Sequence, residues 1–235
     1  MKYAIIAAGE GSRLVDGGIV TPKPLVRLNG EAMIDRLIRI FLSGDAESIS
    51  VIVNLEMREV YGHLRRLRLP VPLHLIRKST PSSMHSFYEL SPTLGNGRFC
   101  LTTVDTIFRE DEFARYIQAF EHTGADGLMA VTDYVDDEKP LYVETDGQMT
   151  VSGFRDEDYA GSRYVSGGIY CLDSRSIPVL KASVDAGMSR MRNCQQQLVR
   201  SGLKLKAWPF SKIIDVDRRE DIRKAEIFLN ETAGD

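Results

Sequence analysis

Up to residue 132, apolar residues follow two spacings, one typical of buried strands and one typical of helices. Short β-branched or apolar runs predict strands, and apolar residues every three or four positions predict helices. The predicted strands are 3–8, 49–53, 73–76, 99–104 and 128–132, and the predicted helices are 33–42, 57–69, 81–90 and 111–122. This alternation predicts a mostly parallel sheet with helices on both faces.

After residue 140 the pattern changes to consecutive short strands, predicted at 141–144, 149–154 and 168–172. We interpret them as an antiparallel addition to the sheet in the C-terminal half. The predicted fold class is therefore α/β, a three-layer αβα Rossmann-like domain with a mostly parallel mixed sheet. No linker, repeat or low-complexity stretch divides the 235 residues, so we expect a single domain over 1–235.

The segment after the first predicted strand combines two glycines with two cations. Gly9 and Gly11 are separated by one residue, which lets the backbone bend sharply and aim N–H groups at an anion. Arg13 follows directly, and Lys23 lies between two prolines. The loop lacks the third glycine of the dinucleotide fingerprint and the Gly-Lys-Ser/Thr of the P-loop. It still predicts a polyphosphate site in which Arg13 and Lys23 hold the phosphates.

Two later strand ends carry carboxylates. Asp105 ends the strand predicted at 99–104, and Asp215 and Asp217 end an apolar run before a charged helix. Parallel sheets bind ligands at the carboxyl ends of their strands, and hard oxygen ligands suit Mg²⁺. These acids are therefore candidate metal ligands, whereas Asp221 is interpreted as a helix-start residue.

Residues 7–14 and 21–25 together resemble the signature of the nucleotidyltransferase superfamily, which includes sugar-1-phosphate nucleotidyltransferases and phosphocholine cytidylyltransferases. The resemblance covers nearly the whole chain, and it implies an NTP donor, Mg²⁺ and a phosphomonoester acceptor. Asp105 resembles the magnesium-binding aspartate of the middle of the chain. One alignment makes Asp215 the second ligand and another makes it Asp217; alternation past the strand end slightly favours Asp217.

The resemblance also implies where the nucleotide binds. Relatives contact the base and donor sugar with the segment that corresponds to 79–84, whose Ser82 is equally suited to cap a helix. Residues 15–21 depart from the family pattern, so the loop there is expected to differ. The nucleotide-binding candidates are Ala8, Gly9, Gly11, Ser12, Arg13, Lys23, Ser82 and Ser83.

The acceptor side departs from the family most. Many sugar-1-phosphate members have Glu-Lys-Pro before a Gly-Ile-Tyr strand, but here Arg155 occupies that region, and the literal Glu-Lys-Pro at 138–140 comes too early. We expect Arg155 to replace the missing lysine if the acceptor is a sugar 1-phosphate. The acceptor-binding candidates are Glu144, Arg155, Gly168 and Tyr170. A phosphocholine acceptor would instead need an aromatic and acidic cage, for which the candidates are Tyr88, Glu144, Tyr170 and Trp208.

The implied reaction is the Mg²⁺-dependent condensation of an NTP with a phosphomonoester, preferably a sugar 1-phosphate, to give an NDP-sugar and pyrophosphate. The second pKa of a phosphomonoester is about 6, so the nucleophile needs no general base. Catalysis then rests on charge neutralisation by Arg13 and Lys23. The alternatives are a CTP:phosphocholine-type cytidylyltransferase, a catalytically silent regulatory relative, and an NDP-sugar-using glycosyltransferase, which is disfavoured because Asp105 does not begin an Asp-x-Asp motif.

Charge and cysteine content limit the partners. The net charge of −3 shows no basic footprint for nucleic acid, and no apolar run reaches the roughly 18 residues of a membrane span. Cys100, Cys171 and Cys194 are widely spaced and are expected to be reduced, as in the cytoplasm. We therefore expect a cytoplasmic enzyme with small-molecule partners, as a monomer or homo-oligomer.

Overall fold

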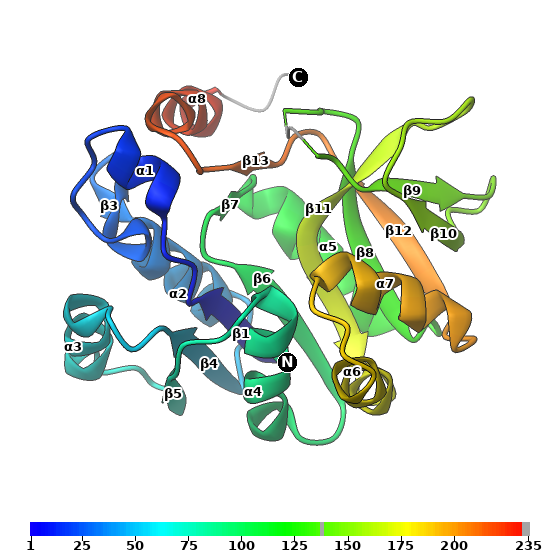
Figure 1. Ribbon diagram of the computed structural model, residues 1–235, viewed down its shortest axis with the longest axis horizontal. Coiled ribbons are helices and arrows are strands. Elements are labelled where there is room, and N and C mark those ends of the chain that lie inside the picture. The colour runs from blue at the N-terminus through cyan, green and yellow to red at the C-terminus, as the bar shows by residue number, and fades with distance from the viewer. Residues whose placement is uncertain (137–138, 232–235) are drawn as a thin grey trace.

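The first half of the chain forms a parallel sheet around its first strand. The structure is a computed structural model that describes residues 1–136 and 139–231 (Figure 1). Strand β1 (Lys2–Ala7) lies between β4 (Ser48–Val53) and β6 (Arg98–Thr103), and β5 (Leu73–Arg77) extends the sheet beyond β4. All of these pairs are parallel. The chain thus leaves β1 at a topological switch point, where loops from both sides of the sheet leave room for a ligand.

The second half adds strands to the other edge of β6, and most of them are antiparallel. The long strand β11 (Tyr164–Asp173) runs antiparallel to β6, to β8 (Gly127–Thr132) and to β9 (Tyr142–Thr145). Strand β10 (Val151–Arg155) pairs with β9, and β12 (Leu205–Phe210) runs parallel to β8. The predicted mixed sheet with its antiparallel addition is confirmed.

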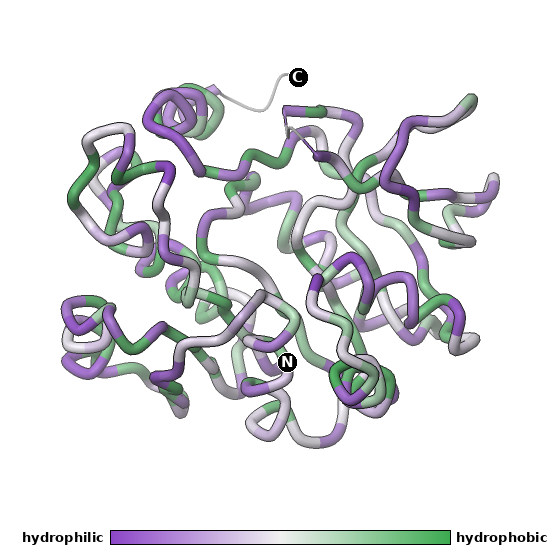
Figure 2. The backbone as a smooth tube through the Cα atoms, in the orientation of Figure 1, coloured by the Kyte–Doolittle hydropathy of each residue, from purple (hydrophilic) through white to green (hydrophobic). Residues whose placement is uncertain are grey.

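Helices cover both faces of the sheet because its central strands are apolar on both sides. Tyr3 and Ile5 of β1 belong to one core, whereas Ala4 and Ile6 belong to the other. The first core is closed by α2 (Met33–Ser43), α3 (Arg58–Arg66), α5 (Glu110–His122) and α8 (Arg219–Asn230), and the second by α4 (Ser83–Leu94), α6 (Ser176–Asp185) and α7 (Met191–Arg200). Figure 2 shows hydrophobic strands inside and hydrophilic segments on the outer helices.

Several elements differ from the sequence-based expectation. Helix α4 continues past residue 90 because Leu94 is buried in the second core, and it ends before Gly95, whose φ is 55°. Helix α3 ends at Arg66, since Leu67 is extended. Helices α6 and α7 and strand β12 had no prediction. Cys100, Cys171 and Cys194 are buried free thiols. Within the described residues, no helix is both long and apolar enough to cross a bilayer.

Two short elements join distant parts of the chain beside β1. Strand β7 (Thr106–Ile107) pairs antiparallel with β13 (Ile214–Asp215), with Asp215 opposite Thr106. The backbone N–H of Val216 also donates to the carbonyl of Asp105 at 3.0 Å. This pairing brings the acidic strand end near residue 105 next to the acidic strand end near residue 217.

Candidate functional site

The glycine loop after β1 forms one wall of a cavity of about 970 Å³. The cavity opens at the carboxyl ends of β1, β4, β5 and β6, as the switch-point rule requires. The candidates Ala8, Gly9, Gly11, Ser12, Arg13, Lys23, Ser82, Ser83, Asp105 and Asp217 all line it. The structure therefore places every nucleotide-binding candidate around one cavity.

Gly11 is required by its conformation and by its neighbour. Its φ of 66° is left-handed, and a β-carbon there would lie 3.0 Å from Cβ of Lys23. Helix α1 (Ser12–Asp16) begins directly after it. Lys23 opens the 3₁₀ helix η1 (Lys23–Leu25), where Pro22 and Pro24 fix the backbone on both sides. The close approach of Gly11 thus seats a lysine that is only 8% exposed.

Four charged side chains meet at the entrance of this cavity. The Lys23 ammonium contacts both Asp105 and Asp217, with 2.5 Å between Lys23 Nζ and Asp217 Oδ1. Arg13 donates to the other oxygen of Asp217 at 2.8 Å. Strand pairing between β7 and β13 brings the segments of Asp105 and Asp217 together beside the loop that holds Arg13 and Lys23. We refer to these four residues as the charge cluster.

The charge cluster shifts the pKa values of its members. Burial opposes the charge on Lys23, but Asp105 and Asp217 outweigh it and raise the Lys23 pKa above its usual range. Burial likewise opposes the charge on Asp217, and Lys23 and Arg13 hold its pKa below the usual range. Both groups are therefore charged at neutral pH, as a phosphate- and metal-binding site needs.

Asp215 lies beside the charge cluster in a different electrostatic environment. Surrounding protein and the charges of Asp105 and Asp217 raise its pKa to about 8. The Asp215 side chain is exposed to solvent. A cation bound nearby would offset the repulsion between the three carboxylates and so lower the pKa of Asp215. The three acids form a carboxylate patch in which Lys23 and Arg13 balance the charges of Asp105 and Asp217, while the raised pKa keeps Asp215 mostly protonated at neutral pH.

The donor chemistry of this patch fits Mg²⁺. Asp105 and Asp217 both hold the same ammonium, so their carboxylates already face a common point. Among the described residues, no group of three or more His, Cys, Asp or Glu side chains forms a ready metal site. Two carboxylates are nevertheless sufficient for Mg²⁺, which usually keeps several waters and takes its other ligands from substrate phosphates.

The far wall of the cavity is held by two polar side chains, of which the sequence analysis singled out Ser82 but not Asn54. Asn54, just after β4, donates to the carbonyl of Ala8 at 3.2 Å and accepts from the N–H groups of Glu56 and Met57. Ser82 caps α4 by accepting from the N–H of His85 at 3.4 Å. The capping role of Ser82 and its place in the cavity thus coexist. The sequence signal that could have identified Asn54 is an Asn directly after a buried strand.

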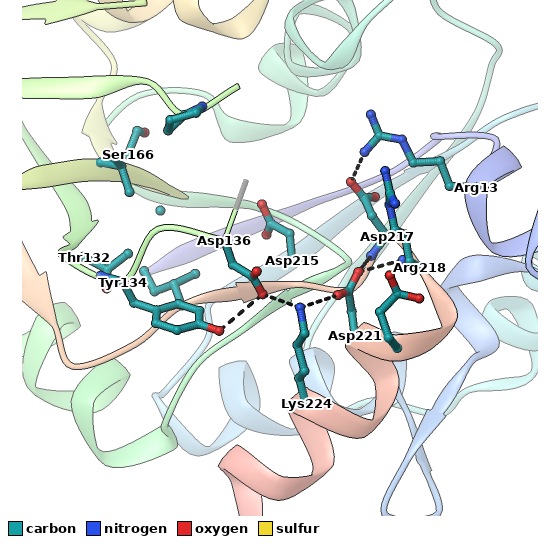
Figure 3. Close-up of a pocket in the computed structure, with 15 residues that line it drawn as sticks. Arg13, Thr132, Tyr134, Asp136, Ser166, Asp215, Asp217, Arg218, Asp221 and Lys224 are labelled. Carbon is teal, nitrogen blue, oxygen red and sulfur yellow. Dashed lines mark hydrogen bonds and ion pairs between the residues drawn. The ribbon is translucent and has the colours of Figure 1, made fainter. Parts of the chain in front are cut away.

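A second cavity, of about 290 Å³, adjoins the first (Figure 3). Arg13 and Asp217 line both cavities, so these two members of the charge cluster form their shared edge. The second cavity is polar and contains Asp215 together with residues that the sequence analysis missed, namely Thr132, Tyr134, Asp136, Ser166, Arg218, Glu220 and Lys224. These residues come from strands β8 and β11, from the loop after β8 and from the first turns of α8, without a recognisable motif.

Helix α8 and the loop after β8 are tied together across this second cavity. Lys224 Nζ lies 2.7 Å from Asp136 and 3.4 Å from Asp221, and the Tyr134 hydroxyl donates to Asp136 at 3.2 Å (Figure 3). Asp221 accepts from the N–H groups of Asp217 and Arg218, which agrees with its interpretation as a helix-start residue. The bonds to Asp221 hold the backbone of Asp217 and Arg218 in a fixed position beside the second cavity.

The sequence-derived acceptor candidates lie in three different places. Gly168 has a left-handed φ of 74°, and a β-carbon there would lie 3.2 Å from Thr106 Oγ1, so it packs against β7. Tyr170 is buried one layer behind the second cavity. Arg155 forms an ion pair with Glu144 at 2.5 Å, and neither residue lines the two cavities.

The cage candidates are also dispersed. Tyr88 packs against the second core, and Trp208 packs against the first. Among the lining residues of the second cavity, Tyr134 is the one aromatic side chain, and the Lys212 ammonium covers a face of its ring at 4.4 Å from the centroid. In the Glu-Lys-Pro segment at 138–140, Glu138 lies outside the described residues.

Tyr170 reaches the second cavity through a buried polar network. Gln195 is 3% exposed; it donates to the Tyr170 hydroxyl at 3.0 Å and accepts from Ser166, which lines the cavity. Burial raises the pKa of Tyr170 above its usual range, so the phenol stays protonated. Tyr170 is thus placed to position Ser166 without itself facing the cavity.

We expect Tyr170→Phe to lower the free energy of unfolding by about 1–3 kcal/mol, because it leaves the Gln195 amide buried without this partner. Thermal and urea unfolding measure the effect. The double variant Tyr170→Phe/Gln195→Leu removes both partners and should lose less than the sum of the single variants. Additive losses would contradict the network.

The fold and this site together define a nucleotide-binding α/β protein with a phosphate loop at its switch point. Residues 3–196 match the MobA-like NTP transferase domain, and the chain belongs to this family. A curated relative, the bifunctional protein GlmU of Thermodesulfovibrio yellowstonii, is 22% identical over 98% of this chain and 52% of its own length. The bifunctional IPC transferase and DIPP synthase of Rubrobacter xylanophilus is 41% identical over 29% of this chain and 15% of its own length. The chain spans about half the length of the first relative and less of the second.

Two solved structures share the whole fold. The inositol-1-phosphate CTP transferase from T. maritima superposes with a TM-score of 0.81 at 16% identity, covering 100% of this chain and 98% of that chain. A putative glucose-1-phosphate thymidylyltransferase from Bacillus anthracis, in complex with a sucrose, gives 0.82 at 20% identity with the same coverage. At these identities the likeness establishes the fold.

Proposed function

We propose that this protein is a Mg²⁺-dependent nucleotidyltransferase that joins an NTP to the phosphomonoester of a polyhydroxylated ring, such as a sugar 1-phosphate, and releases pyrophosphate. The observation that carries the proposal is the shared edge of the two cavities at Arg13 and Asp217. One cavity has the phosphate loop and room for a nucleotide, and the other is polar and smaller. A reaction between two phosphates is what such an edge can support.

The reaction needs positioning and charge neutralisation more than a proton acceptor. An anionic oxygen of the acceptor phosphate attacks the α-phosphorus of the NTP, and the bond from that phosphorus to the α,β-bridging oxygen breaks. Pyrophosphate leaves with the bonding electron pair, and no proton has to be removed from the nucleophile. Arg13 lies at the shared edge and Lys23 lies beside it in the first cavity, and both neutralise charge on the transferring group and leaving pyrophosphate.

Asp105 and Asp217 are the residues that would hold Mg²⁺, which would supply positive charge to neutralise the triphosphate. With nucleotide bound, the Lys23 ammonium is positioned to exchange its carboxylate partners for phosphate oxygens. Asp215 lies on the acceptor side, where its carboxyl group lines the second cavity beside the metal-binding pair. This assignment agrees with the sequence alignment that makes Asp217, and not Asp215, the second metal ligand.

The chemistry of the second cavity favours a polyhydroxylated acceptor over phosphocholine. Carboxylates and the hydroxyls of Thr132 and Ser166 can exchange hydrogen bonds with ring hydroxyls. A quaternary ammonium would need open aromatic faces, whereas Tyr134 is partly covered by Lys212. The structural relatives named for inositol 1-phosphate and glucose 1-phosphate support the same class. A nucleoside-diphosphate-linked polyol is then the product.

A pyrophosphate-release screen tests this proposal. The four NTPs are crossed with glucose 1-phosphate, N-acetylglucosamine 1-phosphate, inositol 1-phosphate and phosphocholine in Mg²⁺, with Lys23→Ala as the matched blank. We expect release with one preferred NTP and a ring phosphate, with product mass equal to the two substrates minus pyrophosphate. Turnover of phosphocholine alone would contradict the acceptor class, and no release in any pair would contradict the activity.

A further inference from the structure

We propose that Arg218, which the sequence analysis did not single out, binds the acceptor phosphate and holds it in line with the α-phosphorus. This inference rests on the proposed nucleotidyl transfer and names a binding residue for its second substrate. It differs from the expectation drawn from chain order, which gave this role to Arg155.

The argument begins with where the acceptor phosphate must lie. The reacting oxygen has to approach the α-phosphorus, so the phosphate sits in the second cavity at its edge with the first. Arg13 and Asp217 mark this edge because they line both cavities. A cation that binds the acceptor phosphate therefore has to line the second cavity next to Asp217.

Arg218 satisfies both conditions. It follows Asp217 in the chain, lines the second cavity and is exposed to solvent. Figure 3 shows its side chain beside Asp217, reaching toward the same side of the cavity as Arg13. Its backbone is held by the bond from its N–H to Asp221 at 2.8 Å, so the start of the side chain is fixed. A guanidinium there can bind two phosphate oxygens at once.

The other cations of the cavity are less suited to this role. Lys224 lies between Asp136 and Asp221, where it ties α8 to the loop after β8. Arg13 points to Asp217 from the nucleotide side and is needed for the triphosphate. Arg155 lies on β10, is paired with Glu144, and lines neither cavity.

Electrostatics gives a reason for an arginine at this position. A phosphomonoester carries about −1.5 to −2 charges at pH 7, and the second cavity presents more acidic than basic side chains. The acids that line it are Asp136, Asp215, Asp217, Glu220 and Asp221. Arginine stays fully charged in such surroundings, and its planar group orients a phosphate as well as attracting it.

Steady-state kinetics of Arg218→Gln tests the inference, with the acceptor that the wild type turns over fastest in the pyrophosphate-release screen. We expect the acceptor KM to rise about tenfold to hundredfold, as for loss of a charge-assisted bond, while the KM for NTP stays within about twofold. Arg218→Lys should recover part of the loss, because it restores the charge without the bidentate geometry.

Arg219→Gln is the matched control, because Arg219 is the next residue, is exposed, and lines neither cavity. It should leave both KM values unchanged. An unchanged acceptor KM in Arg218→Gln would overturn the assignment, and so would a raised acceptor KM in Arg155→Gln but not in Arg218→Gln. In either case, turnover of a ring phosphate by the wild type would still support the proposed function. If the wild type turns over only phosphocholine, the same measurement still decides the role of Arg218. If the wild type turns over no acceptor, the proposed function and the role of Arg218 are both contradicted.

Discussion

Lys23→Ala should reduce kcat/KM for the NTP by about a hundredfold to a thousandfold. Loss of one preorganised charge-stabilising donor commonly has this effect on rate. Here the lysine is 8% exposed, is fixed between two prolines, and contacts both candidate metal ligands. Initial rates of pyrophosphate release at varied NTP concentration measure the change.

Two further variants separate lost charge from lost packing. Lys23→Met keeps an apolar stem against Gly11, so a similar loss of activity in Met and Ala variants assigns the effect to the ammonium. Lys181→Ala on α6 makes the same change of charge at an exposed site and should leave activity unchanged. Near-native kcat/KM in Lys23→Ala, with its fold intact by thermal unfolding, would remove the core of the proposed mechanism.

Asp105→Asn and Asp217→Asn should each raise the Mg²⁺ concentration that gives half-maximal activity and should lower turnover. Asparagine keeps the shape but withdraws a hard anionic ligand. We expect a shift of at least the roughly tenfold to hundredfold that loss of an outer-shell partner produces. Rates measured from micromolar to tens of millimolar Mg²⁺ give the apparent affinity of each variant.

Asp215→Asn completes this set and decides between the two alignments of the acidic strand end. Because Asp215 lies in the second cavity while Asp217 shares the Lys23 ammonium with Asp105, we expect a smaller shift in Asp215→Asn. A larger shift in Asp215→Asn than in Asp217→Asn would reverse the assignment. Unchanged metal dependence in all three variants would mean that these acids serve only to begin α8 and its neighbours.

The sequence by itself determined the layered fold and the position of the glycine loop with its two cations. Burial on both faces makes a parallel strand such as β1 continuously apolar, and the apolar faces of α2 and α5 follow the helical period, so these signals are local. The phosphate loop was equally visible, because Gly11, Arg13 and Lys23 are close in sequence. Gly11 and Lys23 approach each other within this short segment, whereas the ion-pair partners of Arg13 and Lys23 come from distant strand ends.

The meeting of Asp105 with Asp217 and the lining of the second cavity were decided by the tertiary structure. Asp105 and Asp217 meet because β13 pairs with β7, a contact between segments far apart in the chain that no local spacing encodes. Arg218 and Lys224 reach the second cavity because α8 begins at that pairing, and Arg155 misses it because β10 lies beyond β9 at the end of the sheet. Chain order located the glycine loop, but the lining of the second cavity depends on which strands pair, and long-range packing decides that pairing.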